Sequence, residues 1–258
     1  MPDASVLAPV DSASFRWRWW ALMGASLAVF MAALDGNVVN VALPVLAGDF
    51  HADRAIRWVV LAYALPTTAL LGAFGALSDL VGRKRITLVG VALFILGSVL
   101  CGTARSLPQM MVYRVIQGIG GSCIGSAILA IATLNFAAEE RGRAMAVIGL
   151  IAPLGAVVGP SLGGVLIGAL GWPSIFYINV PFGIIAFALI ARLLPGDGAP
   201  QARSFDLAGS VLFSAGLVLL IMGLSPASGR MGTADVLMLG GSAVALGAFA
   251  LVERGARN

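Results

Sequence analysis

Runs of about 20 apolar residues recur along the whole chain, and no other feature restricts the fold so strongly. A helix of that length crosses a hydrocarbon layer of roughly 30 Å. Hydrophobic residues make up 59% of the 258 residues and charged residues 11%, against roughly 25% charged residues in soluble domains. The runs are apolar on every side, unlike the alternating strands of a β-barrel. We therefore predict an all-α integral membrane protein, with the lipid bilayer as its solvent.

The apolar runs, separated by short polar segments, predict eight membrane spans. We place the spans at residues 19–43, 56–79, 86–104, 108–135, 142–170, 173–193, 206–224 and 234–252. The strongest interruption is a polar segment that contains Pro195, Gly196 and Pro200 and separates six spans from two. The predicted organisation is a tail at 1–18, a six-helix bundle at 19–193, a connector at 194–205, two further helices at 206–252 and a terminal segment at 253–258.

The basic residues set the predicted orientation. Of sixteen, eleven fall in the segments on one side of the membrane, four on the other side, and Arg114 within a span. Because cytoplasmic loops are enriched in Lys and Arg, both termini and the connector are predicted to be cytoplasmic. The net charge of +4 comes from these scattered loops, so we expect no nucleic-acid partner.

Several classes of enzyme lack their motifs here. Lys84 is the only lysine and is followed by Arg85, so the chain has no phosphate-binding loop of an ATP-driven pump. His51 is the only histidine, so no H-E-x-x-H metal motif exists. Cys101 and Cys123 both lie in apolar runs and are expected to be buried. We predict no catalytic residue, no metal site and no cofactor.

The loop after the second span is the most specific signal in the chain. It reads GALSDLVGRKR from Gly75 to Arg85, between two apolar helices. Gly75 is expected to allow close helix contact, Asp79 to end a span with a charge, and Gly82 to form a tight turn. The loop resembles the signature loop of the major facilitator superfamily, although Leu80 stands where the family usually has Arg. A generic turn would explain the cations but not the placed glycines and aspartate. The resemblance implies a gating loop with the residues Gly75, Asp79, Gly82, Arg83, Lys84 and Arg85.

Two helices carry candidates for proton coupling. The run LDGNVVNVALP from Leu34 is similar to the first-helix motif of the fourteen-helix drug:proton antiporters (EmrB/QacA type), with Asn37 where that motif has Thr. A carboxylate in an apolar span needs a polar environment, so Asp35 is a candidate proton site. A role for Asp35 in helix packing or capping is the alternative. Helix geometry turns Asn37 and Asn40 away from Asp35, so these three groups should not form one cluster.

The fourth span carries RVIQGIGG from Arg114, similar to the fourth-helix motif of proton-coupled facilitators. Arg114, Gln117, Gly118 and Gly121 share one helix face. We expect Arg114 to face the protein interior, and the resemblance associates Arg114 and Gln117 with proton coupling. The alternative is an arginine that reaches the membrane interface along its aliphatic stem.

The fifth span reads GAVVGPSLGG from Gly155, and it resembles the motif associated with antiporters. Glycines at every fourth position predict a groove for a neighbouring helix, and Pro160 lacks a backbone donor. Generic glycine packing would explain the spacing alone. The resemblance assigns this motif the residues Gly155, Gly159, Pro160, Gly163 and Gly164 and implies export. The sixth span, at 173–193, opens with the run GWPSIFYINVP from Gly171, which is again similar to the fourteen-helix family, with Pro173 and Ser174 where that family typically has Arg and Trp. We interpret Asn179 in this run as a residue of helix entry, without a catalytic role.

These resemblances predict a major facilitator N-terminal six-helix bundle with two additional transmembrane helices, in the cell (inner or plasma) membrane. The implied function is proton-coupled efflux of small lipophilic molecules, driven by the proton gradient, with protons and substrate as ligands. Such transporters rock two bundles about a central site, and the chain has one bundle, so we predict a truncated or partial protein. A transport-inactive fragment, or a half-transporter that needs a separate second six-helix bundle, is the alternative.

Overall fold

The computed structural model describes residues 12–52, 55–197, 207–225 and 231–256, and these residues are helical apart from short turns. Helices occupy all eight predicted spans. They are α1 (Ser12–Asp49), α2 (Trp58–Ala69), α3 (Leu71–Val81), α4 (Arg83–Gly102), α5 (Leu107–Asn135), α6 (Ala138–Leu170), α7 (Ser174–Tyr177), α8 (Asn179–Leu193), α9 (Leu207–Gly223) and α10 (Thr233–Ala256). Five of the described helices are long and apolar enough to cross a membrane, and the bent pair α2 and α3 could add a sixth.

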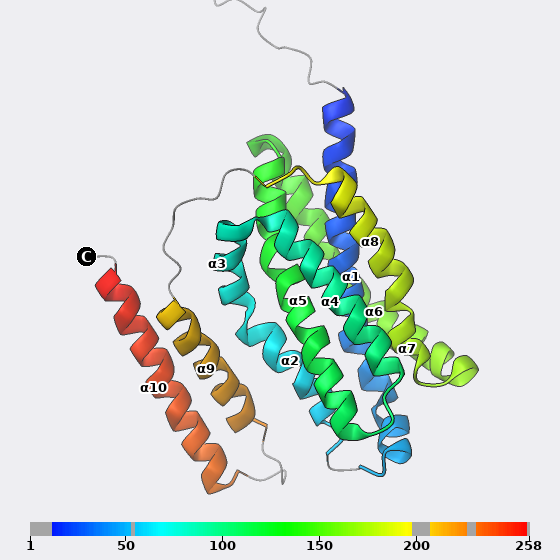
Figure 1. Cartoon of the computed structure of the whole chain (residues 1–258), viewed down its shortest axis with the longest axis vertical. Helices are drawn as coiled ribbons and strands as arrows, with labels where there is room; N and C mark the ends of the chain where they lie inside the picture. Colours follow the sequence, from blue (N-terminus) through cyan, green and yellow to red (C-terminus); the bar gives the residue numbers. More distant parts are fainter. Residues whose placement is uncertain (1–11, 53–54, 198–206, 226–230, 257–258) are drawn as a thin grey trace, which may run out of the picture.

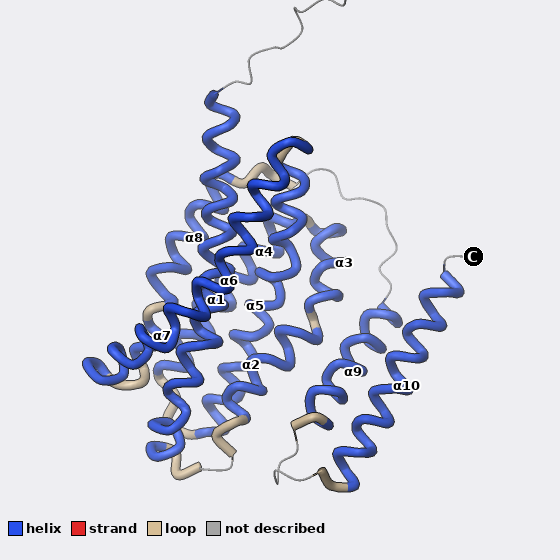
Figure 2. The backbone as a smooth tube through the Cα atoms, turned by 180° about the vertical axis from the view of Figure 1, so that it is seen from behind, coloured by secondary structure: helices blue, strands red, loops and turns tan. Residues whose placement is uncertain are grey.

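The helices from α1 to α8 form one bundle, and α9 and α10 lie beside it as a separate pair (Figure 1). The view from behind shows the same division, with the pair next to α2 and α3 (Figure 2). Within the bundle, α4 packs on α5, α1 on α6 and α8, and α2 on α5. The buried apolar side chains form a core between these helices, with members such as Met31, Phe94 and Ile190.

The boundaries of α1 and of the second span differ from the prediction. The helix α1 already begins at Ser12, within the predicted tail, and continues past Pro44 to Asp49. The span predicted at 56–79 is two helices that meet at a bend of 47°. Pro66 lies one turn before this bend, inside α2, and its missing N–H concerns the Ala62 carbonyl, not the break. The carbonyl of Ala69 at the break accepts a 2.6 Å hydrogen bond from the Ser214 hydroxyl of α9, which satisfies a backbone group that a straight helix would use internally.

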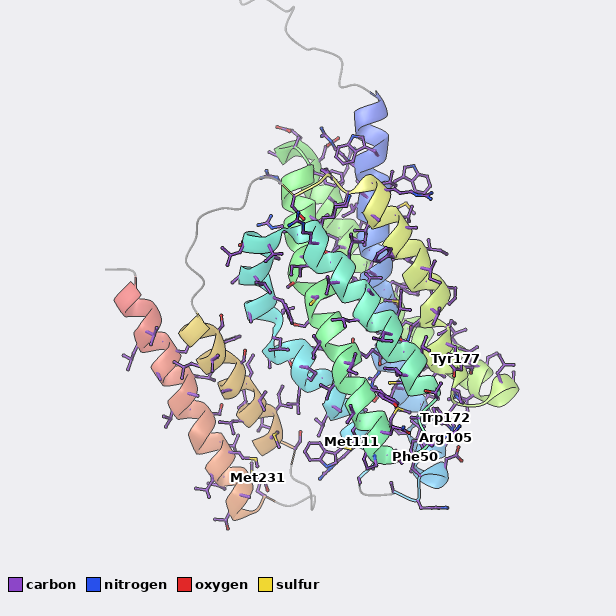
Figure 3. All side chains as sticks on the ribbon, viewed as in Figure 1. Phe50, Arg105, Met111, Trp172, Tyr177 and Met231 are labelled. Atoms are coloured by element: carbon purple, nitrogen blue, oxygen red, sulfur yellow. The ribbon has the colours of Figure 1, made fainter. Side chains whose placement is uncertain are left out.

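Aromatic side chains tie the end of α1 to the segment before α7. Phe50, Trp172 and Tyr177 lie at the same end of the bundle (Figure 3). The Trp172 indole donates a 2.7 Å hydrogen bond to the Asp49 carboxylate, and the rings of Phe50 and Trp172 meet edge to face at 5.7 Å. These contacts position α7 and the start of α8 against α1.

Candidate functional site

A buried ion pair joins α1 to α5 in the interior of the bundle. A terminal guanidinium nitrogen of Arg114 lies 2.5 Å from Asp35 Oδ2, and the two side chains are 1% and 0% exposed. Arg114 therefore faces the protein interior, as predicted, and does not reach towards the membrane interface. Two opposite charges without solvent require further hydrogen bonds to be tolerated.

Three neutral polar side chains supply those hydrogen bonds. Gln117 Nε2 and Asn179 Nδ2 each donate to Asp35 Oδ1 at 2.9 Å. The Ser98 hydroxyl oxygen accepts from the same two amides, at 2.8 Å from Gln117 and 3.3 Å from Asn179. Arg114 also donates to Gln117 Oε1 at 2.6 Å. The cluster of Asp35, Ser98, Arg114, Gln117 and Asn179 thus draws on α1, α4, α5 and α8, and we call it the polar cluster.

The helices α2 and α7 enclose the arginine. Its Nε donates to the Val59 carbonyl at 3.2 Å. The guanidinium carbon lies 4.3 Å from the centre of the Tyr63 ring and 5.8 Å from that of Phe176, within the range of cation–π attraction. Tyr63 and Phe176 thereby favour the charged guanidinium on two sides, while Asp35 is its only carboxylate partner among the described residues.

Glycines bring the helices of the polar cluster together. A Cβ on Gly97 of α4 would lie 2.7 Å from Cα and Cβ of Gln117, and a Cβ on Gly118 of α5 would lie 2.5 Å from the Tyr63 carbonyl oxygen. Real Cβ atoms do not approach other atoms this closely, so both positions require glycine. The prediction that the Arg114 face of α5 admits a neighbouring helix is confirmed.

The glycine motif of α6 packs along α1, next to the polar cluster. Gly155, Gly159 and Gly163 are buried, and a Cβ on each would lie within 3.0 Å of Ala33, Asn37 or Val38 of α1. The predicted groove is therefore present. Two other residues of the motif do not contribute to it, because Pro160 is exposed and a Cβ on Gly164 would meet no atom within 4 Å.

The two asparagines of α1 stay outside the polar cluster, as predicted. The amide of Asn37 donates to the Ala33 carbonyl at 2.7 Å and that of Asn40 to the Gly36 carbonyl at 3.1 Å. Each therefore returns to the backbone of its own helix.

The signature loop is held by local contacts and by the connector. Arg83 pairs with Asp79 at 2.6 Å, with both side chains about one third exposed. Gly82 has a φ of 115°, a backbone conformation that favours glycine, so the predicted tight turn is confirmed. The role expected of Gly75 is wrong within the described residues, because a Cβ there would meet no atom within 4 Å.

The first residues of the connector dock on this loop. Asp197 accepts hydrogen bonds from the backbone N–H groups of Lys84 at 2.9 Å and Arg85 at 3.2 Å, at the start of α4. Lys84 Nζ donates to the Leu194 carbonyl at 2.6 Å. A carboxylate at a helix N-terminus is favourable for the helix dipole. The rest of the predicted connector, from residue 198, lies outside the described residues.

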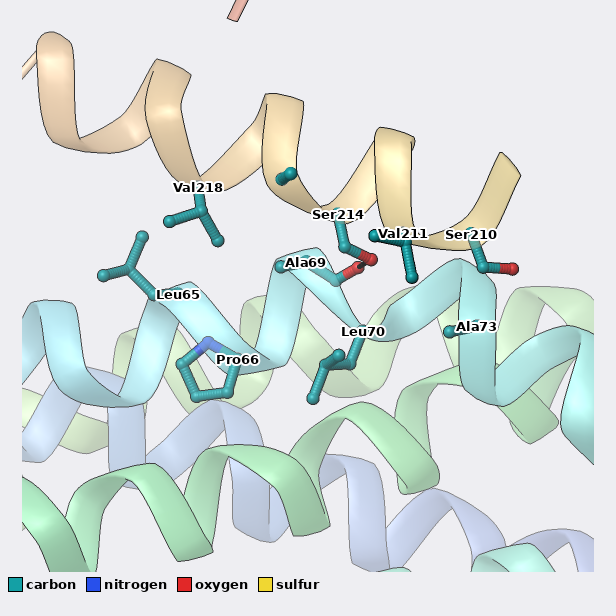
Figure 4. A pocket seen from close by; sticks show the side chains of 10 residues that line it. Leu65, Pro66, Ala69, Leu70, Ala73, Ser210, Val211, Ser214 and Val218 are labelled. Atoms are coloured by element: carbon teal, nitrogen blue, oxygen red, sulfur yellow. Dashed lines mark hydrogen bonds between the residues drawn. The ribbon is translucent and has the colours of Figure 1, made fainter. Parts of the chain in front are cut away.

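A groove runs between the bundle and the pair of α9 and α10. Its volume is about 590 Å³, and its walls include Leu65 and Pro66 of α2, Leu70 at the break before α3, and Val211 and Val218 of α9 (Figure 4). The Ser214 hydroxyl in this wall is used by the Ala69 carbonyl. The groove is therefore an apolar surface at the bend between α2 and α3, and its lining includes no residue of the polar cluster.

The sequence pointed to three of the five side chains in the polar cluster. Asp35, Arg114 and Gln117 were predicted, and the structure brings them together. Asn179 is the first residue of α8, but its side chain makes no cap to that helix and instead bonds Asp35, so its interpretation as only a helix-starting residue is wrong. A buried asparagine in an apolar run could have indicated this role. Ser98 carries no comparable signal.

Comparisons with known proteins agree with this architecture. The family model described as Major Facilitator Superfamily matches residues 25–209. The chain is 37% identical to the "Riboflavin transporter RibZ" of Clostridioides difficile over 81% of this chain and 46% of the relative. It is 38% identical to the "Puromycin resistance protein pur8" of Streptomyces alboniger over 98% of this chain and 52% of the relative.

A third relative, "Multidrug resistance protein Stp" of Mycobacterium tuberculosis, is 35% identical over 94% of this chain and 46% of the relative. The chain thus spans about half the length of these relatives. Among solved structures, the POT family transporter PepTSo has a TM-score of 0.67 at 13% identity, covering 91% of this chain and 52% of that chain. A bacterial homolog of the human lysosomal transporter Spinster has a TM-score of 0.63 at 20% identity, covering 89% and 58%.

The low identity of the solved structures supports the fold alone, but the family model covers most of the chain. This match establishes the family, and the helical bundle agrees with it. The chain belongs to the Major Facilitator Superfamily, and its apolar helices are those of a multi-pass membrane protein.

Proposed function

We propose that this chain contains the proton site of an exporter that moves small lipophilic molecules out of the cell in exchange for protons. The observation that carries the proposal is the buried Asp35–Arg114 pair, surrounded by amide and hydroxyl groups. A carboxylate inside a membrane bundle is costly to keep and is a functional candidate by default. Asp35 would bind the transported proton, and Arg114 and Gln117 would stabilise its ionised form.

Protonation of Asp35 would change how α1 is held against α5. In the ionised state the carboxylate bridges Arg114 of α5 and Asn179 of α8. A neutral acid loses the Coulombic attraction to Arg114, and a buried arginine without its partner is costly. The conformation with this ion pair closed is therefore disfavoured after protonation. This link between proton binding and helix packing is what an antiporter needs.

The proposed direction and orientation rest on the remaining motifs. The α6 glycine groove against α1 belongs to the motif associated with antiporters, which favours export. The loop from Gly75 to Arg85 would act as the gating loop on the cytoplasmic side, with both termini on that side and the protein in the cell membrane. Because the chain spans about half of its relatives, transport is proposed for a protein with a second bundle, against which this loop would close.

The substrate class is supported by the names of relatives. Relatives at 35% and 38% identity are named for multidrug and puromycin resistance. A second candidate substrate is a flavin, because the relative at 37% identity is named a riboflavin transporter. The two candidates share the same proposed proton site, so both are tested together.

The test uses everted membrane vesicles from cells that express the complete reading frame. Respiration acidifies the vesicle lumen, and a pH-sensitive dye reports the gradient. We expect addition of ethidium, puromycin or riboflavin to dissipate part of the gradient, and Asp35→Asn to abolish this response. Glu139→Gln, at an exposed acid on α6, is the control and should respond like the wild type. An equal response from Asp35→Asn would contradict the proposal.

A further inference from the structure

We propose that Asn179 is a positioning residue that follows the protonation state of Asp35. Its amide nitrogen faces the carboxylate when Asp35 is ionised. When Asp35 binds a proton, the amide turns by about 180° and accepts the new O–H on Oδ1. The inference rests on the proposed function, because it requires Asp35 to gain and lose a proton.

The side chains that face the carboxylate are all donors. Arg114, Gln117 and Asn179 each donate an N–H to Asp35. This arrangement suits an ionised carboxylate, which only accepts hydrogen bonds. A protonated Asp35 carries an O–H of its own, and a buried donor without an acceptor costs about 1–3 kcal/mol. Proton binding therefore requires a new acceptor in the polar cluster.

The other groups of the cluster are poor acceptors for this proton. A guanidinium has no acceptor atom. Gln117 Oε1 already accepts from Arg114 at 2.6 Å and from the Cys101 thiol at 3.8 Å. The Ser98 oxygen accepts from two amides. Proton binding at Asp35 would displace one of these existing bonds if it used any of them.

The side-chain oxygen of Asn179, Oδ1, is available as this acceptor. Asn179 is fully buried, and Oδ1 has no hydrogen-bond partner in the described part of the chain. The nitrogen and oxygen ends of a carboxamide have nearly the same shape, so they can exchange places within one cavity. After the turn, Oδ1 would face Asp35 and Ser98, where Nδ2 now donates to both. It could then accept the acid O–H and the Ser98 hydroxyl proton.

The position of Asn179 connects this turn to the helices. It begins α8 directly after α7, whose Phe176 ring contacts the Arg114 guanidinium. The other titratable groups that face the polar cluster are Tyr63 on α2 and Cys101 on α4, besides Arg114 itself. At this depth α6 and α8 contribute no titratable side chain. Asn179 thus links the protonation state of Asp35 to the α7–α8 junction, and it does so as a neutral side chain.

The direct test is a solid-state NMR measurement on the whole protein, expressed from its complete reading frame, in lipid vesicles. Aspartate is labelled with ¹³C at Cγ and asparagine with ¹⁵N at Nδ2, and the Asp35 chemical shift reports its protonation. We expect strong ¹³C–¹⁵N dipolar coupling between Asp35 and Asn179 while Asp35 is ionised, and loss of this coupling once Asp35 is protonated. Asn179→Thr identifies the signal by removing it.

A matched pair of variants provides the functional test. Threonine and valine have nearly the same shape, but only the threonine hydroxyl can both donate and accept. We expect Asn179→Thr to retain proton-coupled export, and Asn179→Val to lower it about tenfold or more. Equal transport by the two variants would overturn the proposal. So would a coupling that persists after Asp35 is protonated. If the chemical shift shows that Asp35 does not titrate, both the proposed function and this proposal fail. If Asp35 titrates but the coupling persists, only this proposal fails.

Discussion

Replacing Arg114 with methionine should destabilise the protein strongly, and the loss should shrink as the pH falls. The variant leaves the Asp35 carboxylate buried without its positive partner, and both side chains are 1% exposed or less. Removing one member of a buried pair costs about 3–5 kcal/mol, and this site has no solvent to screen the charge. For a chain of this size the cost corresponds to a fall in melting temperature of roughly 10 °C.

The sign of the pH effect follows from which charge remains. In Arg114→Met the unpaired group is an acid, and protonation removes its charge. The deficit relative to the wild type should therefore be largest at high pH and smaller at low pH. The double variant Asp35→Asn, Arg114→Met buries neither charge, so it should lose less stability than Arg114→Met alone.

The two cysteines of the chain can report its unfolding in this measurement. Cys101 and Cys123 are the only cysteines in the sequence, and they are 0% and 1% exposed. A fluorogenic maleimide therefore reacts with them only when heating opens the bundle. Arg83→Met is the control, because it breaks the partly exposed pair with Asp79 and should cost about 1 kcal/mol or less. The reasoning is refuted if the separate losses of Asp35→Asn and Arg114→Met simply add up to the loss of their double variant. It is also refuted if the stability deficit of Arg114→Met does not depend on pH.

Three further predictions use the same thiol assay. Gly97→Val should prevent stable folding, because a Cβ there would lie 2.7 Å from Gln117. Gly168→Ala is the control and should be tolerated, because a Cβ there would meet no atom within 4 Å. Equal stability of the two variants would count against the close packing of α4 and α5. Ser214→Ala should cost about 1 kcal/mol, because the Ala69 carbonyl at the bend loses its partner; an unchanged melting temperature would show that this bond contributes nothing. Asp197→Ala should cost about 0.5–2 kcal/mol through the two N–H groups at the start of α4, and a melting temperature equal to that of the wild type would argue against this contact.

The features that the sequence predicted best depend on local spacing. Arg114 and Gln117 lie on one helix face because they are three residues apart, and Gly155, Gly159 and Gly163 form a groove because they recur every four residues. Both arrangements, the polar face of α5 and the glycine groove of α6, follow from helix geometry alone. The turn at Gly82 likewise depends on one residue type in one backbone conformation.

The features that the sequence missed depend on contacts between distant helices. Asp35 and Asn179 are 144 residues apart, and no local spacing relates them. Ser98 joins the polar cluster only because Gly97 lets α5 approach α4. Pro66 does not mark the bend after α2, because its missing N–H concerns the Ala62 carbonyl one turn earlier. The Ala69 carbonyl at the break has its partner on α9, which no local pattern shows.

The most direct test of the proton site at Asp35 compares two kinds of transport by one variant. The complete protein is reconstituted in vesicles, and Asp35→Asn is assayed for exchange of labelled substrate at equal pH and for accumulation driven by a pH gradient. We predict that exchange persists while gradient-driven accumulation is lost, because the variant can still move but cannot bind the proton. Gradient-driven accumulation at the wild-type level in Asp35→Asn would contradict the account.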